Sequence, residues 1–193
     1  MKKKLVLSVT LPIVVMTFAS AANADAISYI VPNGTVGGQT FGGELGMDFD
    51  VNSDITITHL GVFDSSSNGL SLPLNARLWD RNNTAAPLAT LSFAAGSPGH
   101  LVNGSRFLPL ATPITLSAGF QGTISGSGYG AGEPNGNKGV AGFASSTNSD
   151  GGAISFVGGG RFGGAGSYPG TPDGGPADRY ASGTFVTHET GST

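Results

Sequence analysis

Apolar and polar side chains alternate with a period of two along most of this chain, and this alternation constrains the fold more than any other feature. In residues 47–51 the odd positions are apolar and the even ones are aspartates, as in a strand with one face toward a core. Leu74, Ala76 and Leu78 share one parity, and residues 89–93 repeat the pattern. No window of useful length has the i, i+3, i+4, i+7 spacing of an amphipathic helix. We therefore predict an all-β fold.

One apolar run changes phase partway along its length. Ile55 and Ile57 lie on one parity, whereas Leu60 and Val62 lie on the other. A shift of one residue exposes the wrong face of a strand unless a β-bulge absorbs the extra residue. We predict a bulge within residues 58–61.

Turn-forming residues separate the short strands at regular intervals, for example at residues 65–69, 80–83 and 97–99. Short strands at this spacing indicate an antiparallel β-sandwich of jelly-roll type with long glycine-rich loops. We expect residues 25–193 to form it as a single domain.

The character of the chain changes in residues 126–178, which hold 18 of its 33 glycines and few large apolar side chains. Such a stretch has little to bury and loses much backbone entropy on ordering. We predict long loops there around one short strand at residues 153–157. Residues 180–186 resume the strand pattern and should pair back into the sandwich, and the polar residues 187–193 should be frayed.

Residues 1–24 have the three parts of a secretory signal peptide: three lysines, a short apolar region, and small residues that end in Ala22-Asn23-Ala24. A membrane anchor needs about 20 consecutive apolar residues, and this run is shorter and contains Pro12. We predict cleavage after Ala24, with Ala26 as the alternative. The product should be extracellular or periplasmic and have no membrane span.

The mature chain of 169 residues carries six basic and twelve acidic side chains, a net charge of about −6. Nucleic-acid binding requires a basic patch that neutralises phosphates, and the six basic residues are scattered, so we expect no nucleic-acid partner. The chain contains no cysteine, which excludes thiol chemistry and zinc–thiolate sites and indicates a bacterial exported protein held together by packing alone.

Several motif matches fail for lack of context. Residues 158–163 spell G-x-G-x-x-G, but the glycines and proline that follow forbid the helix that a nucleotide site needs. No G-x-S-x-G serine elbow occurs, and His59, His100 and His188 have no metal-pair spacing, so we interpret them as structural or solvated.

We predict no resident cofactor, with calcium as the open alternative. The candidate calcium ligands are aspartates at predicted strand ends and turns: Asp48, Asp50, Asp64, Asp80 and Asp178.

Trp79 is the only tryptophan, and it lies on the same strand face as Asn75 and Arg77. A flat aromatic ring flanked by polar groups can serve as a sugar-binding platform. The alternative is that Trp79 packs under residues 126–178 or into the second sheet.

Four strings resemble the β-sandwich domain of many PEP-CTERM-type exported bacterial proteins: ITHLGVFD at 57–64, ARLWD at 76–80, TPITLSAG at 112–119 and RYASGTF at 179–185. The resemblance covers about residues 45–186 and implies a surface or matrix protein. Members usually end in Pro-Glu-Pro, an apolar span and an arginine cluster, which this sequence does not show. We therefore expect either that the protein is released instead of being sorted to the cell surface, or that the given sequence is cut short.

Three hypotheses for function follow. The leading one is a secreted, non-enzymatic protein of the cell envelope or extracellular matrix with a structural or adhesive role. The second is a carbohydrate-binding module with a polysaccharide partner, which uses Trp79, Arg77 and Asn75 with or without calcium. The third is a hydrolase with an unrecognised carboxylate pair, because glycoside hydrolysis needs only two carboxyl groups across a cleft.

Overall fold

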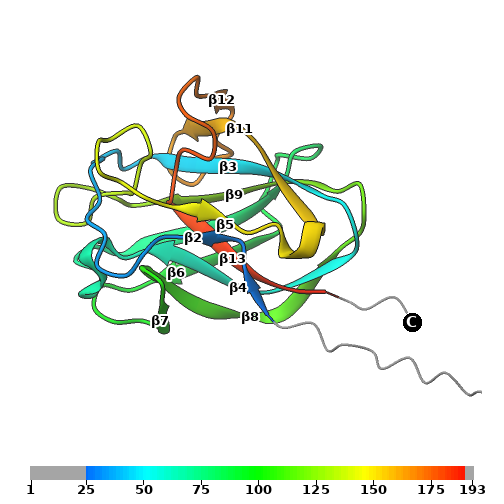
Figure 1. The fold of residues 1–193 in the computed structure, drawn as a ribbon, viewed down its shortest axis with the longest axis horizontal. Helices are drawn as coiled ribbons and strands as arrows, with labels where there is room; N and C mark the ends of the chain where they lie inside the picture. Colours follow the sequence, from blue (N-terminus) through cyan, green and yellow to red (C-terminus); the bar gives the residue numbers. More distant parts are fainter. Residues whose placement is uncertain (1–24, 190–193) are drawn as a thin grey trace, which may run out of the picture.

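A computed structural model describes residues 25–189, which form two antiparallel β-sheets packed face to face (Figure 1). The predicted signal peptide and residues 190–193 lie outside the described residues. None of the helices in residues 25–189 has the length and apolar character needed to cross a membrane. The elements in chain order are β1 (Ala26–Ile27), β2 (Tyr29–Ile30), β3 (Glu44–Val51), β4 (Ile55–Phe63), η1 (Ser65–Ser67), β5 (Leu74–Asp80), β6 (Ala89–Phe93), β7 (His100–Val102), β8 (Ser105–Leu116), β9 (Gln121–Ser127), β10 (Ser146–Thr147), η2 (Asp150–Gly152), β11 (Ile154–Gly163), β12 (Thr171–Pro172) and β13 (Gly183–Glu189).

The larger sheet has the strand order β12-β11-β3-β9-β5-β6, and the smaller has the order β1-β13-β4-β8-β7. The short strands β10 and β2 form a separate pair. Successive strands change sheet from β3 to β4, β4 to β5, β6 to β7 and β8 to β9. The prediction of an all-β antiparallel sandwich is confirmed.

The inward faces of the two sheets enclose one core, as the period-two pattern requires. Leu74, Ala76 and Leu78 of β5 are fully buried in it. Phe49 of β3 contacts Phe185 of β13 across the sandwich, with 4.8 Å between ring centroids. The core therefore joins strands from both sheets by side-chain packing.

The predicted bulge is present at Thr58. Against β13, Val186 pairs with His59 and the next residue, Thr187, pairs with Ile57, so Thr58 is the extra residue in β4. The register against β8 shifts at the same place. The bulge brings both apolar parities of β4 to the core face, and Ile57 and Leu60 are both fully buried.

The glycine-rich region is more structured than predicted. The strand expected at residues 153–157 extends through Gly163 as β11, with a register shift between Val157 and Arg161. Residues 158–163, interpreted above as loop, therefore belong largely to a strand. The prediction failed because pairing with β3 on one side and β12 on the other supplies hydrogen bonds that compensate for the weak strand propensity of glycine.

The last strand begins and ends later than predicted, because β13 runs from Gly183 to Glu189 and pairs with β4. The expectation of a frayed end is wrong for residues 187–189. Thr187 is fully buried, and its hydroxyl donates to Asp150 Oδ2 at 2.6 Å. Pairing with β1 and β4 and this hydrogen bond order a polar segment at the end of the strand.

We expect Phe49→Ala to lower the free energy of unfolding by about 3–5 kcal/mol, because it leaves a cavity among the rings of Phe120, Phe156 and Phe185. Urea denaturation followed by circular dichroism measures this change. The matched control is Leu88→Ala, at a side chain that is 47% exposed, which should change stability by less than about 0.5 kcal/mol. Equal losses in the two variants would contradict the assignment of the core.

Candidate functional site

The predicted sugar platform around Trp79 is covered by the protein itself. Trp79 lies on the outer face of the larger sheet but is only 1% exposed. The ring of Tyr168 packs edge-on against it at a centroid distance of 5.7 Å, and the indole Nε1 donates to Ser125 Oγ at 2.8 Å. The interpretation of Trp79 as an open platform is wrong, and its alternative holds: the residue packs under the loop 164–170.

The partners proposed for Trp79 are also engaged within the protein. Arg77 Nη1 donates to Glu44 Oε2 at 2.7 Å, and the Glu44 carboxylate is fully buried. The same oxygen accepts the backbone N–H of Gly166 at 3.1 Å, which ties the covering loop to the sheet. Asn75 Oδ1 accepts a hydrogen bond from Ser92 at 2.7 Å. These groups hold the loop down and are not presented to a ligand.

Two of the candidate calcium ligands form ion pairs on this outer face. Asp48 accepts hydrogen bonds from Thr123 at 2.5 Å and from Arg161 Nε at 2.6 Å. Asp50 forms an ion pair with Arg81. Arginine charges therefore occupy the positions that a cation would need.

The other three candidate ligands lie elsewhere. The buried Asp64 accepts from Arg106 Nε at 2.6 Å, Asp80 accepts from the backbone N–H of Asn82 at 2.8 Å, and Asp178 lies 3.8 Å from Lys138 Nζ. Within residues 25–189 no cluster of three or more histidine, aspartate or glutamate side chains is placed to hold a metal ion. The five aspartates do not assemble into the calcium site considered above.

The histidines lie away from these groups. His59 and His100 line a hollow on the smaller sheet that is walled by apolar side chains such as Phe107 and Val186. His188 Nδ1 is 3.2 Å from Asp25 Oδ1 at the exposed end of β13. Nδ1 of His59 lies 2.9 Å from Oγ1 of Thr58, so this imidazole is engaged by the hydroxyl of its chain neighbour.

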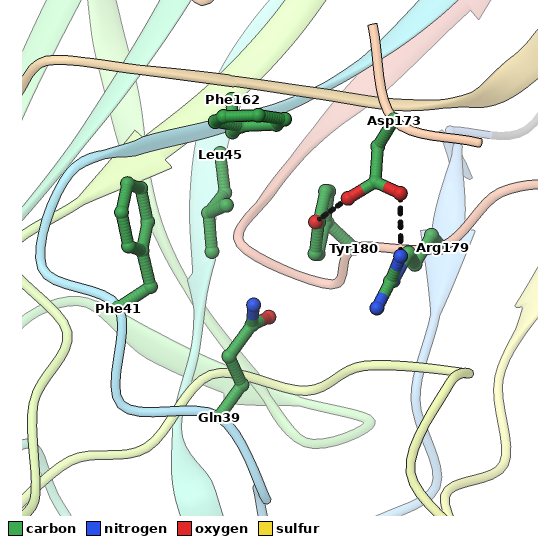
Figure 2. Close-up of a pocket in the computed structure, with 7 residues that line it drawn as sticks. All are labelled: Gln39, Phe41, Leu45, Phe162, Asp173, Arg179 and Tyr180. Carbon is green, nitrogen blue, oxygen red and sulfur yellow. Dashed lines mark hydrogen bonds and ion pairs between the residues drawn. The ribbon is translucent and has the colours of Figure 1, made fainter. Parts of the chain in front are cut away.

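One open hollow in the described part of the chain combines aromatic rings with charged groups. It has a volume of about 240 Å³, Figure 2 shows it, and we call it the Tyr180 hollow. Phe41 and Phe162 form an apolar side, with their rings edge-to-face at 6.4 Å between centroids. The amide of Gln39 points into the space between Phe41 and Tyr180 (Figure 2). The lining residues are Gln39, Phe41, Leu45, Phe162, Asp173, Arg179 and Tyr180.

The register shift in β11, between Val157 and Arg161, positions the residues on the polar side of this hollow. The carbonyl of Gly160 accepts the N–H of Asp173 at 2.8 Å, and that of Gly159 accepts the N–H of Arg179 at 2.7 Å. A Cβ atom at Gly160 would lie 2.8 Å from Cδ2 of Tyr180, so only glycine permits this approach. Consecutive glycines thus bind the segment that carries Asp173, Arg179 and Tyr180.

A network of hydrogen bonds fixes the protonation of the site. Asp173 accepts from Arg179 Nη1 at 2.5 Å and also from the hydroxyl of Tyr180. Partial burial opposes ionisation of Asp173, but these bonds, the Gly175 N–H and the Arg179 charge outweigh it and lower its pKa. Burial, together with the bond to Asp173, raises the pKa of Tyr180 to about 12. Near neutral pH the hollow therefore presents a carboxylate, a guanidinium and a neutral phenol.

Asn137 forms a rigid floor beside this network. Its Nδ2 donates to Gln39 Oε1 at 3.0 Å, and its Oδ1 accepts from Arg179 Nε at 3.0 Å and from the N–H of Gly139 at 2.7 Å. Asn137 is itself buried. Gln39 and Arg179 are therefore held in place before any ligand arrives.

Sequence reasoning missed every residue that lines this hollow. Arg179 and Tyr180 stand out only in a family-like string and, for Tyr180, at the start of the strand predicted at 180–186, and Phe162 only inside a failed nucleotide motif. One usable signal is the group Asp173, Arg179 and Tyr180, which places both charges and an aromatic ring close together in the sequence.

The chain matches no family among the protein-family models, and a search of curated proteins finds no match either.

The burial of Trp79 is directly measurable, since it is the only tryptophan. We expect its fluorescence to be blue-shifted and quenched by acrylamide several-fold less than that of free tryptophan. Tyr168→Ala removes the covering ring and should increase the quenching, whereas Tyr29→Phe, on another part of the molecule, should leave it unchanged. Efficient quenching in the unmodified chain would contradict the covered platform.

The lowered pKa of Asp173 predicts a pH dependence of stability. A carboxyl group with a folded-state pKa below its usual 3.8 adds stability above that value and loses it as the pH falls through the folded-state pKa. Asp173→Asn should therefore melt below the unmodified protein at pH 7, with a difference that shrinks as the pH falls below 3.8. Thermal unfolding at pH 7, 5 and 3 checks this, with the exposed Asp25→Asn as control. A difference that does not change with pH would refute the prediction.

Proposed function

We propose that this chain is an exported, non-enzymatic protein that adheres to saccharides of the cell envelope or extracellular matrix through the Tyr180 hollow. The observation that carries this proposal is the pairing of the exposed Phe41 ring and the half-buried Phe162 ring with a preorganised set of polar groups in one open hollow. The proposal joins the adhesive role to the carbohydrate-binding alternative and moves the binding site away from Trp79.

The chemistry of the hollow suits a sugar ring. The rings of Phe41 and Phe162 offer an apolar surface for the C–H face of a pyranose. Asp173 accepts hydrogen bonds, Arg179 donates them, and Gln39 does both, which matches neighbouring hydroxyl groups. Asn137 holds Gln39 and Arg179 in position, so binding costs little side-chain entropy.

The balance of charge in the hollow favours a neutral ligand. Asp173 and Arg179 neutralise one another at 2.5 Å, which leaves no excess charge to attract an ion. An anionic polymer would also be repelled by a mature chain of net charge about −6. A neutral, hydroxyl-rich ligand uses both members of the pair without separating them.

Two features support binding without hydrolysis. Asp173 is the only carboxylate among the described residues that line the hollow, whereas glycoside hydrolysis needs two carboxyl groups. Its lowered pKa also keeps it ionised near neutral pH, so it is a poor general acid.

The proposed location rests on the sequence. Residues 1–24 have the pattern of a secretory signal peptide, and the strings at 57–64 and 179–185 resemble exported surface or matrix proteins. The mature charge also disfavours nucleic acid as a partner. A polysaccharide outside the inner membrane is a ligand consistent with all three.

The test is a glycan array with the purified chain, followed by titration of the best ligand. Phe41→Ala removes a ring that is 40% exposed, and we expect it to weaken binding about tenfold, equivalent to the ~1.4 kcal/mol of a lost aromatic contact. Leu88→Ala is the control and should bind normally. An empty array would overturn the proposal, and release of reducing sugar ends from a bound glycan would replace it with the hydrolase hypothesis.

A further inference from the structure

A second hollow lies next to the Tyr180 hollow. It has a volume of about 420 Å³ and is lined by residues 35–38 and 140–143, and we call it the Val140 hollow. Four of its eight lining residues are Gly37, Gly38, Ala141 and Gly142. Because these residues have little or no side chain, main-chain N–H and C=O groups form much of the wall.

Two separate links in the chain join the hollows. Gly38 lines one hollow, and its neighbour Gln39 lines the other. On the opposite wall, Val140 lines one hollow and follows Gly139, where a Cβ atom would lie only 3.1 Å from Arg179 Nη2. The two hollows therefore adjoin at residues 38–39 and at the 139–140 segment beside Arg179, and no described residue lines both of them.

Asn137 links the residues at this boundary, because it bonds to Gln39, to Gly139 and to Arg179. A Cβ atom at Gly38 would lie 2.7 Å from Cγ1 of Val140, so the Val140 side chain packs against the backbone of Gly38 where the two hollows adjoin.

Exposed apolar side chains line both hollows. Phe41 belongs to the Tyr180 hollow, whereas Val36 (66% exposed) and Val140 (37% exposed) line the Val140 hollow. Exposed apolar residues that gather along a hollow indicate a contact surface more strongly than the same residues scattered singly.

From this continuity we infer that the ligand is a linear neutral polysaccharide whose adjacent sugar units occupy the Tyr180 and Val140 hollows at the same time. The inference rests on the proposed function and specifies its ligand as a polymer instead of a single sugar. The Tyr180 hollow alone is smaller than the range of about 300–1,000 Å³ that is typical of small-molecule sites, and the two together fall within it.

Each hollow has a separate role in this arrangement. The Tyr180 hollow supplies directed side-chain hydrogen bonds and the aromatic surface, which select the sugar. The Val140 hollow supplies main-chain groups and aliphatic contacts from Val36 and Val140, which suit a repeating unit without further selection. Linking two weak contacts through one polymer makes the second an intramolecular event and raises the affinity.

The experiment compares binding of neutral oligosaccharides of one to six units, built from glucose, galactose, mannose or N-acetylglucosamine. Ligand-observed NMR titration measures the weak monosaccharides and calorimetry the longer chains. We expect affinity to rise about tenfold or more between one unit and two or three, and then to level off. The double variant Val36→Ser/Val140→Ser should lose this rise and keep the monosaccharide affinity. Val36→Ser alone, at the more exposed position, should lose part of it.

The controls separate this inference from the proposed function. Leu88→Ser changes an equally apolar exposed side chain that lines neither hollow, and it should keep the full dependence on chain length. Equal affinity for one unit and six, or an unchanged rise in the double variant, would overturn the inference and leave saccharide binding intact. Failure of every sugar to bind at any length would overturn the proposed function itself.

Discussion

Buried carboxylates that accept hydrogen bonds from backbone N–H groups and arginines are the interaction on which the irregular part of this structure depends. Glu133 accepts from the N–H groups of Ser65 and Ser71, both at 2.7 Å, and Glu44 accepts from Arg77 and Gly166. Glycine-rich loops have no side chains to bury, and a chain without cysteine has no disulfides to close them. A few carboxylates therefore order long stretches of chain, and burial raises the pKa of Glu133 accordingly. Removal of a partner would leave an uncompensated charge inside the protein.

One hairpin, made of β11 and β12, connects the covered face with the open site. Its turn, residues 164–170, lies over Trp79 and is tied to the sheet by Glu44. Its flanks carry Phe162 and Asp173 into the Tyr180 hollow. The same backbone path thus buries the residue that looked most suited to bind a sugar and assembles a different site beside it. The glycines of the β11 bulge make this possible, because their carbonyls hold the following segment and leave room for Tyr180.

This geometry suits adhesion because it is preorganised and close to neutral. The ion pairs of the outer face are satisfied within the protein, and Asp173 and Arg179 balance one another in the hollow. We expect a surface of this kind to attract few ions and to present hydrogen-bonding groups in fixed positions, so that in the proposed function selectivity arises from shape and hydroxyl pattern instead of charge. The adjoining Val140 hollow is the second contact in the inferred binding of a linear polymer.

The sequence alone determined the fold class, because a period of two is a local property. The alternation around Leu74 and Leu78 predicted the core face, and the phase change before Leu60 predicted a bulge within residues 58–61, which the structure places at Thr58. It did not determine the site. Gln39 and Phe41 are more than 130 residues from Arg179 and Tyr180 along the chain, and only strand pairing brings them together. For the same reason the sequence could not predict that Tyr168 covers Trp79. The ring of Tyr168 reaches Trp79 through a loop whose glycines favour no particular backbone path. Tertiary hydrogen bonds between the carbonyls of Gly159 and Gly160 and the N–H groups of Arg179 and Asp173 selected that path.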